Sequence, residues 1–261
     1  MTSSSSAQSL QGRAVLVTRP AHQAEKLARL ISEANGVAVR FPALAIDPPS
    51  DPTRVKELLL GLQTFHLAVF VSGNAVDHGL ALLGSTWPPA VAVAAVGEGS
   101  AAALRGHGIA TVIAPSGSAD SESLLAAPQL QNLQGKRVLI LRGEGGRELL
   151  AEELRVRGAD VTYVECYRRV RPYADPSAII SRWEQGALHA VTAMSGETLD
   201  NLEAMLGPRG QQLLRTTPLF VPHASIAERA RRIGLMEVAV TPPGDEGVVR
   251  GLRTWFSLRT G

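Results

Sequence analysis

VLVTRP at residues 15–20 is a short apolar run that stops at Arg19, and VLILRG at residues 138–143 repeats it with Arg142 in the matching place. After each run come a loop, a segment with the apolar spacing of a helix, a glycine and a second apolar run. Segments 15–39 and 138–161 therefore form a repeat with an offset of 123 residues (138 − 15). Such a repeat predicts two copies of one structural unit.

The repeat continues along the chain. AVFVSGNAVDHGLALL from Ala68 matches AVTAMSGETLDNLEAML from Ala190, and AVGEGSAAALRGHGI from Ala95 matches FVPHASIAERARRIGL from Phe220. Each segment has the pattern of a buried strand, a polar turn and an amphipathic helix. Apolar strands that alternate with helices are typical of parallel sheets with helices on both faces. The sequence therefore predicts an α/β fold with two parallel-sheet domains.

Two connections lack helical periodicity and contain prolines, at residues 40–52 and 165–176. We expect them to form a hinge that the chain crosses twice, with a cleft between the two domains, where small-molecule sites are common. The predicted parts are a disordered tail at 1–12, a discontinuous α/β domain from 13–40 and 173–261, a continuous α/β domain at 48–165, and linker strands at 41–47 and 166–172.

Composition excludes several classes of protein. The 261 residues are 45% hydrophobic, yet no uncharged apolar run reaches the roughly 18 residues of a membrane span. A net charge of +2 argues against a nucleic-acid partner. The single cysteine, Cys166, rules out an internal disulfide and suits a reducing compartment, so we expect a cytoplasmic protein. The histidines show no ligand spacing, so no metal site is expected.

Polar turns follow the apolar runs, and in parallel sheets ligands bind beyond the carboxyl ends of the strands. Taken singly, the serines in these turns are helix caps, and Ser225 and Glu228 have the spacing of a capping box. Taken together, several helix N-termini would form a main-chain anion site that suits a ligand with many carboxylates. GEGG at 143–146 lacks the GK[ST] ending of a phosphate loop. The residues placed to open helices are Ser72, Asn74, Ser100, Ser195 and Ser225.

The segments VLVTRP, FVSGNAV, AVGEGSA, ADSESLL, LRGEGGRELLAEELRVRGADVTYVECYRR and SGETLDNL, in this order, resemble the uroporphyrinogen-III synthase family over essentially the whole chain after the tail. The resemblance implies two flavodoxin-like α/β domains joined by a two-stranded linker. For the oligomeric state, a monomer is the simplest expectation. It implies a hydro-lyase of haem biosynthesis that closes hydroxymethylbilane into uroporphyrinogen III, inverting ring D and releasing water. The partner would be this small linear tetrapyrrole with eight carboxylates, and neither cofactor nor metal would be needed.

The resemblance also assigns site residues. Tyr167 would be the catalytic residue, donating a hydrogen bond to the departing hydroxyl of ring A. The chain departs from the family pattern at Val71 and Pro222, where threonine and glycine are usual. The predicted substrate-binding residues are Arg19, Ser72, Gly73, Asn74, Gly97, Ser100, Arg142, Ser195, Gly196 and Ser225.

Two alternatives stay open at this point. Arg19 and Arg142 could face an acidic ligand, or each could brace its own loop by bonding carbonyl groups. The chain could also be a non-catalytic, two-lobed tetrapyrrole-binding or regulatory protein of the same fold, since fold alone does not fix function. Such a protein would bind the bilane without releasing the type III product.

Overall fold

The computed structural model describes residues 9–115 and 120–259, and the chain divides into two compact units. Unit 1 comprises the described residues up to Ala45 together with those from Val170 onward, and unit 2 runs from Ile46 to Arg169. The chain therefore passes between the units twice. Among the described residues, no helix is both long and apolar enough to cross a membrane.

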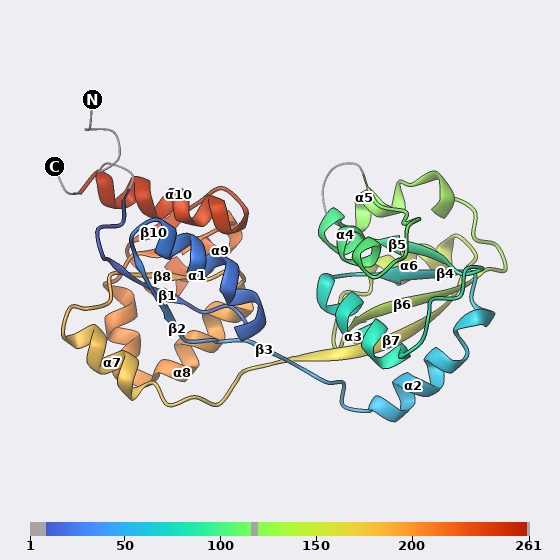
Figure 1. Cartoon of the computed structure of the whole chain (residues 1–261), viewed down its shortest axis with the longest axis horizontal. Helices are drawn as coiled ribbons and strands as arrows, with labels where there is room; N and C mark the ends of the chain where they lie inside the picture. Colours follow the sequence, from blue (N-terminus) through green and yellow to red (C-terminus); the bar gives the residue numbers. More distant parts are fainter. Residues whose placement is uncertain (1–8, 116–119, 260–261) are drawn as a thin grey trace. The chain divides into compact units, whose positions relative to one another are not determined.

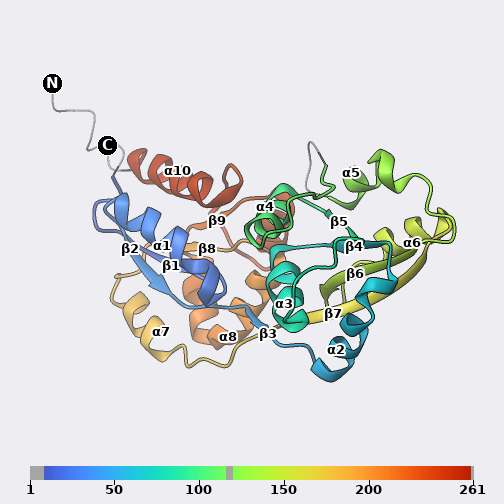
Figure 2. The ribbon, with the colours of Figure 1, turned by 45° about the vertical axis from the view of Figure 1, so that its right-hand side comes forward.

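Unit 1 is built on a five-stranded parallel sheet in the order β10-β9-β8-β1-β2. Helices α1 and α10 cover one face, and α7 and α8 cover the other (Figures 1 and 2). The buried residues of α9 belong to the same core as those of α7 and α8. The strands are β1 (Ala14–Val17), β2 (Val37–Arg40), β8 (Ala190–Thr192), β9 (Leu219–Val221) and β10 (Val238–Val240). The helices are η2 (Ala21–Gln23), α1 (Ala24–Glu33), α7 (Ser177–Glu184), α8 (Gly196–Arg215), α9 (Ala224–Arg232) and α10 (Gly244–Ser257).

Unit 2 has a sheet in the order β3-β7-β6-β4-β5, in which β4 to β7 pair in parallel. Helices α2, α3 and α4 pack on one face, and α5 and α6 pack on the other. The strands are β3 (Ala45–Asp47), β4 (Leu67–Phe70), β5 (Ala92–Ala95), β6 (Arg137–Gly143) and β7 (Asp160–Val170). The helices are α2 (Pro52–Leu60), η3 (Leu62–Thr64), α3 (Gly73–Leu83), α4 (Glu98–Gly106), α5 (Ser121–Leu125), η4 (Pro128–Leu130) and α6 (Leu149–Val156).

The strand orders confirm the repeat and the predicted α/β fold. The order β9-β8-β1-β2 in unit 1 corresponds to β5-β4-β6-β7 in unit 2, with repeat partners in matching places. In unit 1 the order β2-β1-β8-β9-β10 is the flavodoxin-like order 2-1-3-4-5. Unit 1 therefore combines β1 and β2 of the first copy with β8 and β9 of the second, and unit 2 combines β4 and β5 of the first copy with β6 and β7 of the second.

Both sheets are buried on both faces, as their continuous apolar strands predict. β1 and β4 are buried at all four positions, and the aromatic residues Phe70 in β4 and Phe220 in β9 are inaccessible to solvent. Burial of one such side chain contributes about 1.5–3 kcal/mol. The core of each unit therefore fixes the register of its strands, and with it the position of the loops at their carboxyl ends.

The structure differs from the sequence-based prediction at the N-terminus. Residues 1–8 of the predicted tail lie outside the described residues. Leu10, however, is fully buried in unit 1, and its N–H donates to the carbonyl of Ala34 at 2.7 Å. The packed part of the chain therefore begins before residue 13. The sequence does not reveal this, because one apolar residue in a serine-rich context gives no periodic pattern.

The second predicted linker strand, 166–172, also differs. β7 continues to Val170, and Cys166 and Tyr167 are buried in the core of unit 2. The charged run after Tyr167 resembles a surface connection in sequence, although its first residues still belong to a long strand. Most of this segment is therefore part of unit 2.

Candidate functional site

Two of the predicted helix-opening serines cap helices directly after sheet strands. Ser72 is the N-cap of α3, and its Oγ accepts the N–H of Ala75 at 3.1 Å. Ser195 is the N-cap of α8, and its Oγ accepts the N–H of Thr198 at the same distance. They occupy matching places in the repeat, one in each unit, and each cap satisfies a helix N–H that would otherwise lack a partner.

The other two serines are not caps, and the capping box predicted for Ser225 and Glu228 is wrong. α9 begins at Ala224 because His223 takes the extended N-cap conformation, which places Ser225 inside the first turn. Gly97 is the N-cap of α4, so Ser100 lies within that helix and is buried. In both turns the helix begins earlier than the position of the serine suggests.

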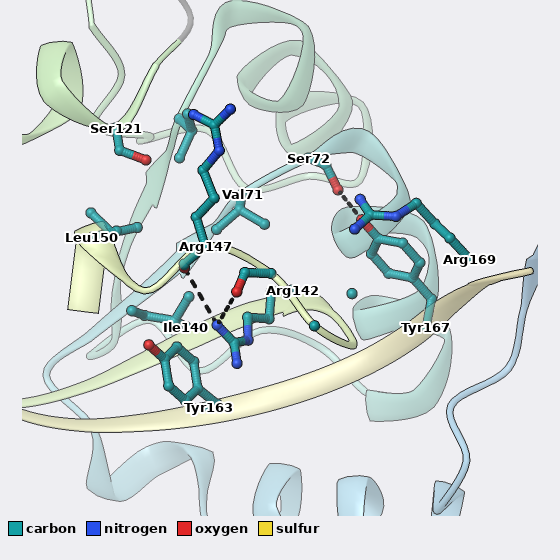
Figure 3. A pocket seen from close by; sticks show the side chains of 14 residues that line it. Val71, Ser72, Ser121, Ile140, Arg142, Arg147, Leu150, Tyr163, Tyr167 and Arg169 are labelled. Carbon is teal, nitrogen blue, oxygen red and sulfur yellow. Dashed lines mark hydrogen bonds between the residues drawn. The ribbon is translucent and has the colours of Figure 1, made fainter. Parts of the chain in front are cut away.

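A pocket of about 300 Å³ lies at the carboxyl ends of β4, β6 and β7 in unit 2 (Figure 3). It brings together three of the predicted residues, Ser72, Arg142 and Tyr167. Gly73, Asn74, Gly97 and Ser100 begin the adjacent helices α3 and α4 but are not among its lining residues. The lining is Val71, Ser72, Val96, Ser121, Ile140, Arg142, Gly143, Gly145, Gly146, Arg147, Leu150, Tyr163, Tyr167 and Arg169.

Tyr167 and Ser72 form a hydrogen-bonded pair at one side of this pocket. The phenol oxygen lies 3.1 Å from Ser72 Oγ, and either oxygen can be the donor (Figure 3). Tyr167 is only 3% exposed, and the imidazole ring of His78 lies 5.8 Å from its ring, centroid to centroid. Because the Ala75 N–H already donates to Ser72 Oγ, the serine hydroxyl can donate to the phenol oxygen and leave the phenol hydrogen available to a ligand.

Arg142 enters the same pocket but is occupied by groups of unit 2. Its side chain is 9% exposed and contacts Glu148 at 2.8 Å and Glu165 at 3.0 Å. It also donates to the carbonyl oxygens of Gly146 and Arg147, at 3.3 and 3.4 Å. Its guanidinium stacks on the ring of Tyr163, 3.6 Å from the centroid. This geometry is that of the loop-bracing alternative, and it leaves little of the charge of Arg142 for a ligand.

The acidic and phenolic groups around Arg142 form one network. The Tyr163 hydroxyl donates to Glu148 at 2.5 Å, and this bond, followed by the bond from Arg142, lowers the pKa of Glu148. Burial, followed by the bond to Glu148, raises the pKa of Tyr163. Burial opposes the charge of Arg142, but its bonds to Glu148 and Glu165 outweigh burial and raise its pKa. At neutral pH the network therefore holds Arg142 charged, Glu148 charged and the phenol of Tyr163 neutral.

Unit 1 holds the remaining predicted residues, at the carboxyl ends of β1, β8 and β9. Arg19 follows β1 and is ion-paired with Asp245, a buried residue in the first turn of α10. Gly196 is the first residue of α8, and Ser225 lies in the first turn of α9. Both repeated strand–arginine motifs thus end in an arginine that is paired with a carboxylate of its own unit.

Cys166 is a packed thiol in the core of unit 2. It is fully buried beneath α3, and its Sγ lies 3.4 Å from the carbonyl oxygen of Arg142. Burial raises its pKa to about 12. At neutral pH the thiol is therefore protonated and is not a nucleophile.

Sequence reasoning missed several lining residues, above all Arg147, Tyr163 and Gly143. Arg147 is exposed and ends the glycine-rich loop between β6 and α6, and in the described part of the chain its guanidinium has no ion pair. In Figure 3 its side chain extends away from Arg142, toward the side of the pocket where Ser121 lies. An arginine in a glycine-rich loop directly after a strand would have been the pattern by which to find it.

Comparisons with known proteins give a consistent result. The family described as "Uroporphyrinogen-III synthase HemD" matches residues 25–247. The uroporphyrinogen-III synthase of Escherichia coli K12 is 33% identical over 245 residues, which cover 92% of this chain and 99% of the relative. That of Salmonella typhimurium LT2 is 34% identical with the same coverage of both chains.

Solved structures resemble the fold. A mutant uroporphyrinogen III synthase from Thermus thermophilus matches with a TM-score of 0.59 at 18% identity, covering 96% of this chain and 100% of that one. The uroporphyrinogen-III synthetase of Helicobacter pylori 26695 matches with a TM-score of 0.56 at 16% identity and the same coverage. At these identities the likeness concerns the two-domain α/β fold alone.

Proposed function

Because the chain belongs to the uroporphyrinogen-III synthase family, we infer that it catalyses the family's reaction, the closure of hydroxymethylbilane into uroporphyrinogen III with inversion of ring D and loss of water. The observation that carries this conclusion is the match to curated relatives at 33–34% identity over nearly their whole length. The protein is a lyase of tetrapyrrole biosynthesis. No observation favours the alternative of a non-catalytic binding protein.

We propose that Tyr167 assists the departure of the ring A hydroxyl by donating a hydrogen bond to it. Its position at the pocket and its bond to Ser72 support this role, since that bond can hold the phenol oxygen while its hydrogen points to the substrate. The ring A hydroxyl takes up a proton and leaves as water, and the substituted carbon of ring D attacks the cation that remains on ring A. The bilane also closes unaided to the type I isomer, so the enzyme mainly imposes geometry and stabilises developing charge.

The test of this function is a coupled assay. Hydroxymethylbilane is generated fresh, the protein is added, and the oxidised type I and type III uroporphyrins are separated by chromatography. We expect type III product with the protein and type I product in its absence. Type I product alone from folded protein, with the bilane bound, would instead establish the non-catalytic alternative.

We further propose that Arg147, rather than Arg142, binds a substrate carboxylate at this pocket. Arg142 is nearly buried and already bonded to two carboxylates and two carbonyl groups, whereas Arg147 is exposed and faces the pocket. An arginine matches the planar geometry of a carboxylate through two parallel hydrogen bonds. On this proposal Arg142 braces the loop that presents Arg147.

Arg147→Gln is expected to raise the KM for hydroxymethylbilane by about 10-fold, the loss of one charged hydrogen-bonded contact. Its melting temperature should match that of the wild type, because Arg147 makes no ion pair within the described residues. Arg142→Gln is expected to lower the melting temperature, since Glu148 and Glu165 lose their partner. Steady-state kinetics and thermal unfolding of both variants measure these effects.

The matched control is Arg54→Gln, which removes an exposed arginine of α2 in the same unit. Arg54 is paired with the exposed Glu57 and does not line the pocket. Its KM should stay at the wild-type value. If Arg147→Gln behaves like this control while Arg142→Gln raises the KM without loss of stability, the two arginines have the opposite roles.

A further inference from the structure

The strand that carries Tyr167 has an irregularity directly before it. In the pairing of β6 with β7, Arg142 lies opposite Glu165, but the next residue, Gly143, lies opposite Tyr167. Cys166 is therefore an extra residue in β7, a β-bulge. Bulges are rare between parallel strands, and they are concentrated near active sites, where they change the direction of a side chain.

The bulge decides which face of the sheet Tyr167 joins. Tyr163 and Tyr167 are four residues apart, so regular alternation would place both rings on one face. Instead Tyr163 packs against the α5–α6 side of the sheet, and Tyr167 joins Val164 and Cys166 in the core beneath α2, α3 and α4. Only on that side does the phenol reach Ser72 at the start of α3.

Three contacts hold the irregular pairing in place. Arg142 donates to Glu165 through Nη2 at 3.0 Å, which joins the last regular pair before the bulge. The Cys166 thiol lies 3.4 Å from the Arg142 carbonyl oxygen. The N–H of Glu144 donates to the Tyr167 carbonyl at 2.9 Å, which restores the pairing after it.

Gly143 provides the space for the ring. A β-carbon at this position would lie 2.7 Å from Cε2 and Cζ of Tyr167 and 3.0 Å from its hydroxyl oxygen. Carbon atoms do not approach so closely, so any side chain at residue 143 would displace the phenol away from Ser72. Gly143, the first glycine of LRGEGG, is therefore needed for the Tyr167 ring to occupy its position on the neighbouring strand.

We infer that Gly143 and the Arg142–Glu165 pair are positioning residues, which through the bulge at Cys166 aim the Tyr167 hydroxyl at the pocket. The inference rests on the proposed function, and it predicts that these residues act through the phenol. Misplacement of a catalytic group by about 1 Å can cost about 100-fold in rate. Gly143→Ala is therefore expected to lower kcat about 100-fold with little change in KM.

A double-mutant cycle between residues 143 and 167 tests this inference. Gly143→Ala should lower kcat in the wild type but by less than about 2-fold in the Tyr167→Phe background, because the hydroxyl is already absent. Glu165→Gln, which keeps the shape of the side chain but removes its charge, enters a second cycle and remains informative if Gly143→Ala does not fold. Gly106→Ala is the control, since a β-carbon there meets nothing within 4 Å.

The outcomes separate the inference from the proposed function. Type III product from the wild type supports the proposed function. If the effects of Gly143→Ala and Glu165→Gln on kcat also disappear in the Tyr167→Phe background, the inference is supported as well. The inference is overturned if Gly143→Ala retains wild-type kcat. It is also overturned if the two substitutions lower kcat by the same factor with and without the phenol of Tyr167. It is also overturned if Tyr167→Phe is fully active, although the function then stands. Only absence of type III product from the wild type removes the function itself.

Discussion

Tyr167→Phe is expected to lower kcat for type III formation by about 100-fold or more, the lower end of what a positioned proton donor contributes. The substitution removes one oxygen atom from a residue that is 3% exposed, so the packing of unit 2 should be retained. As the enzymatic rate falls, unaided closure of the bilane competes, and the product should shift from type III to type I. Chromatography of the oxidised products measures both the rate and the isomer ratio.

Tyr173→Phe serves as the control for this substitution. Tyr173 is six residues further along the chain and its side chain is fully exposed, so the same chemical change there should leave kcat and isomer ratio unchanged. Equal activity of the two variants would show that the Tyr167 hydroxyl takes no part in the reaction. Circular dichroism of both variants would show that the comparison concerns folded protein.

Gly247→Ala is expected to lower the free energy of unfolding by about 3 kcal/mol, the cost of forcing an atom into a close-packed site. Gly247 lies in the first turn of α10, and a β-carbon there would lie 2.1 Å from the carbonyl oxygen of Pro242. This oxygen belongs to the backbone and cannot rotate away. The start of α10 must therefore move, and with it the buried Asp245 that pairs with Arg19.

Urea unfolding followed by circular dichroism measures this loss. Gly106→Ala is the matched control, because it adds the same methyl group to a helical glycine with nothing within 4 Å. Its stability should equal or exceed that of the wild type, since alanine favours the helix more than glycine does. A Gly247→Ala protein as stable as this control would mean that α10 begins differently.

The sequence was sufficient to predict most of the fold. The repeated strand–helix pattern has strong periodicity, and the apolar runs at β1 and β6 could be placed because sheets buried on both faces need continuous apolar strands. Leu10 and the end of β7 were misjudged. A single buried leucine and a charged strand end carry no periodic pattern, and only tertiary packing determines where they lie.

Less of the candidate site could be predicted. Ser72 and Tyr167 were placed by resemblance, and the structure brings them within hydrogen-bond distance. Whether Arg142 was available to a ligand depends on Glu148 and Glu165, whose approach follows from the three-dimensional loop and not from spacing in the sequence. The bulge at Cys166 was equally hidden, because a one-residue shift between two strands leaves no mark in either strand alone.

The exchange of strands between the two copies of the repeat affects how the chain folds as it leaves the ribosome. Unit 2 is a continuous segment, so all of its strands have been synthesised once residue 169 is added. β1 has its neighbour β8 far downstream, with Val15 opposite Ala190, 175 residues later (190 − 15). Domains generally fold as units during synthesis. The β1-α1-β2 segment is therefore translated before unit 2 but belongs to the domain that is completed after it. The edge of β1 that pairs with β8 stays unpaired while unit 2 folds.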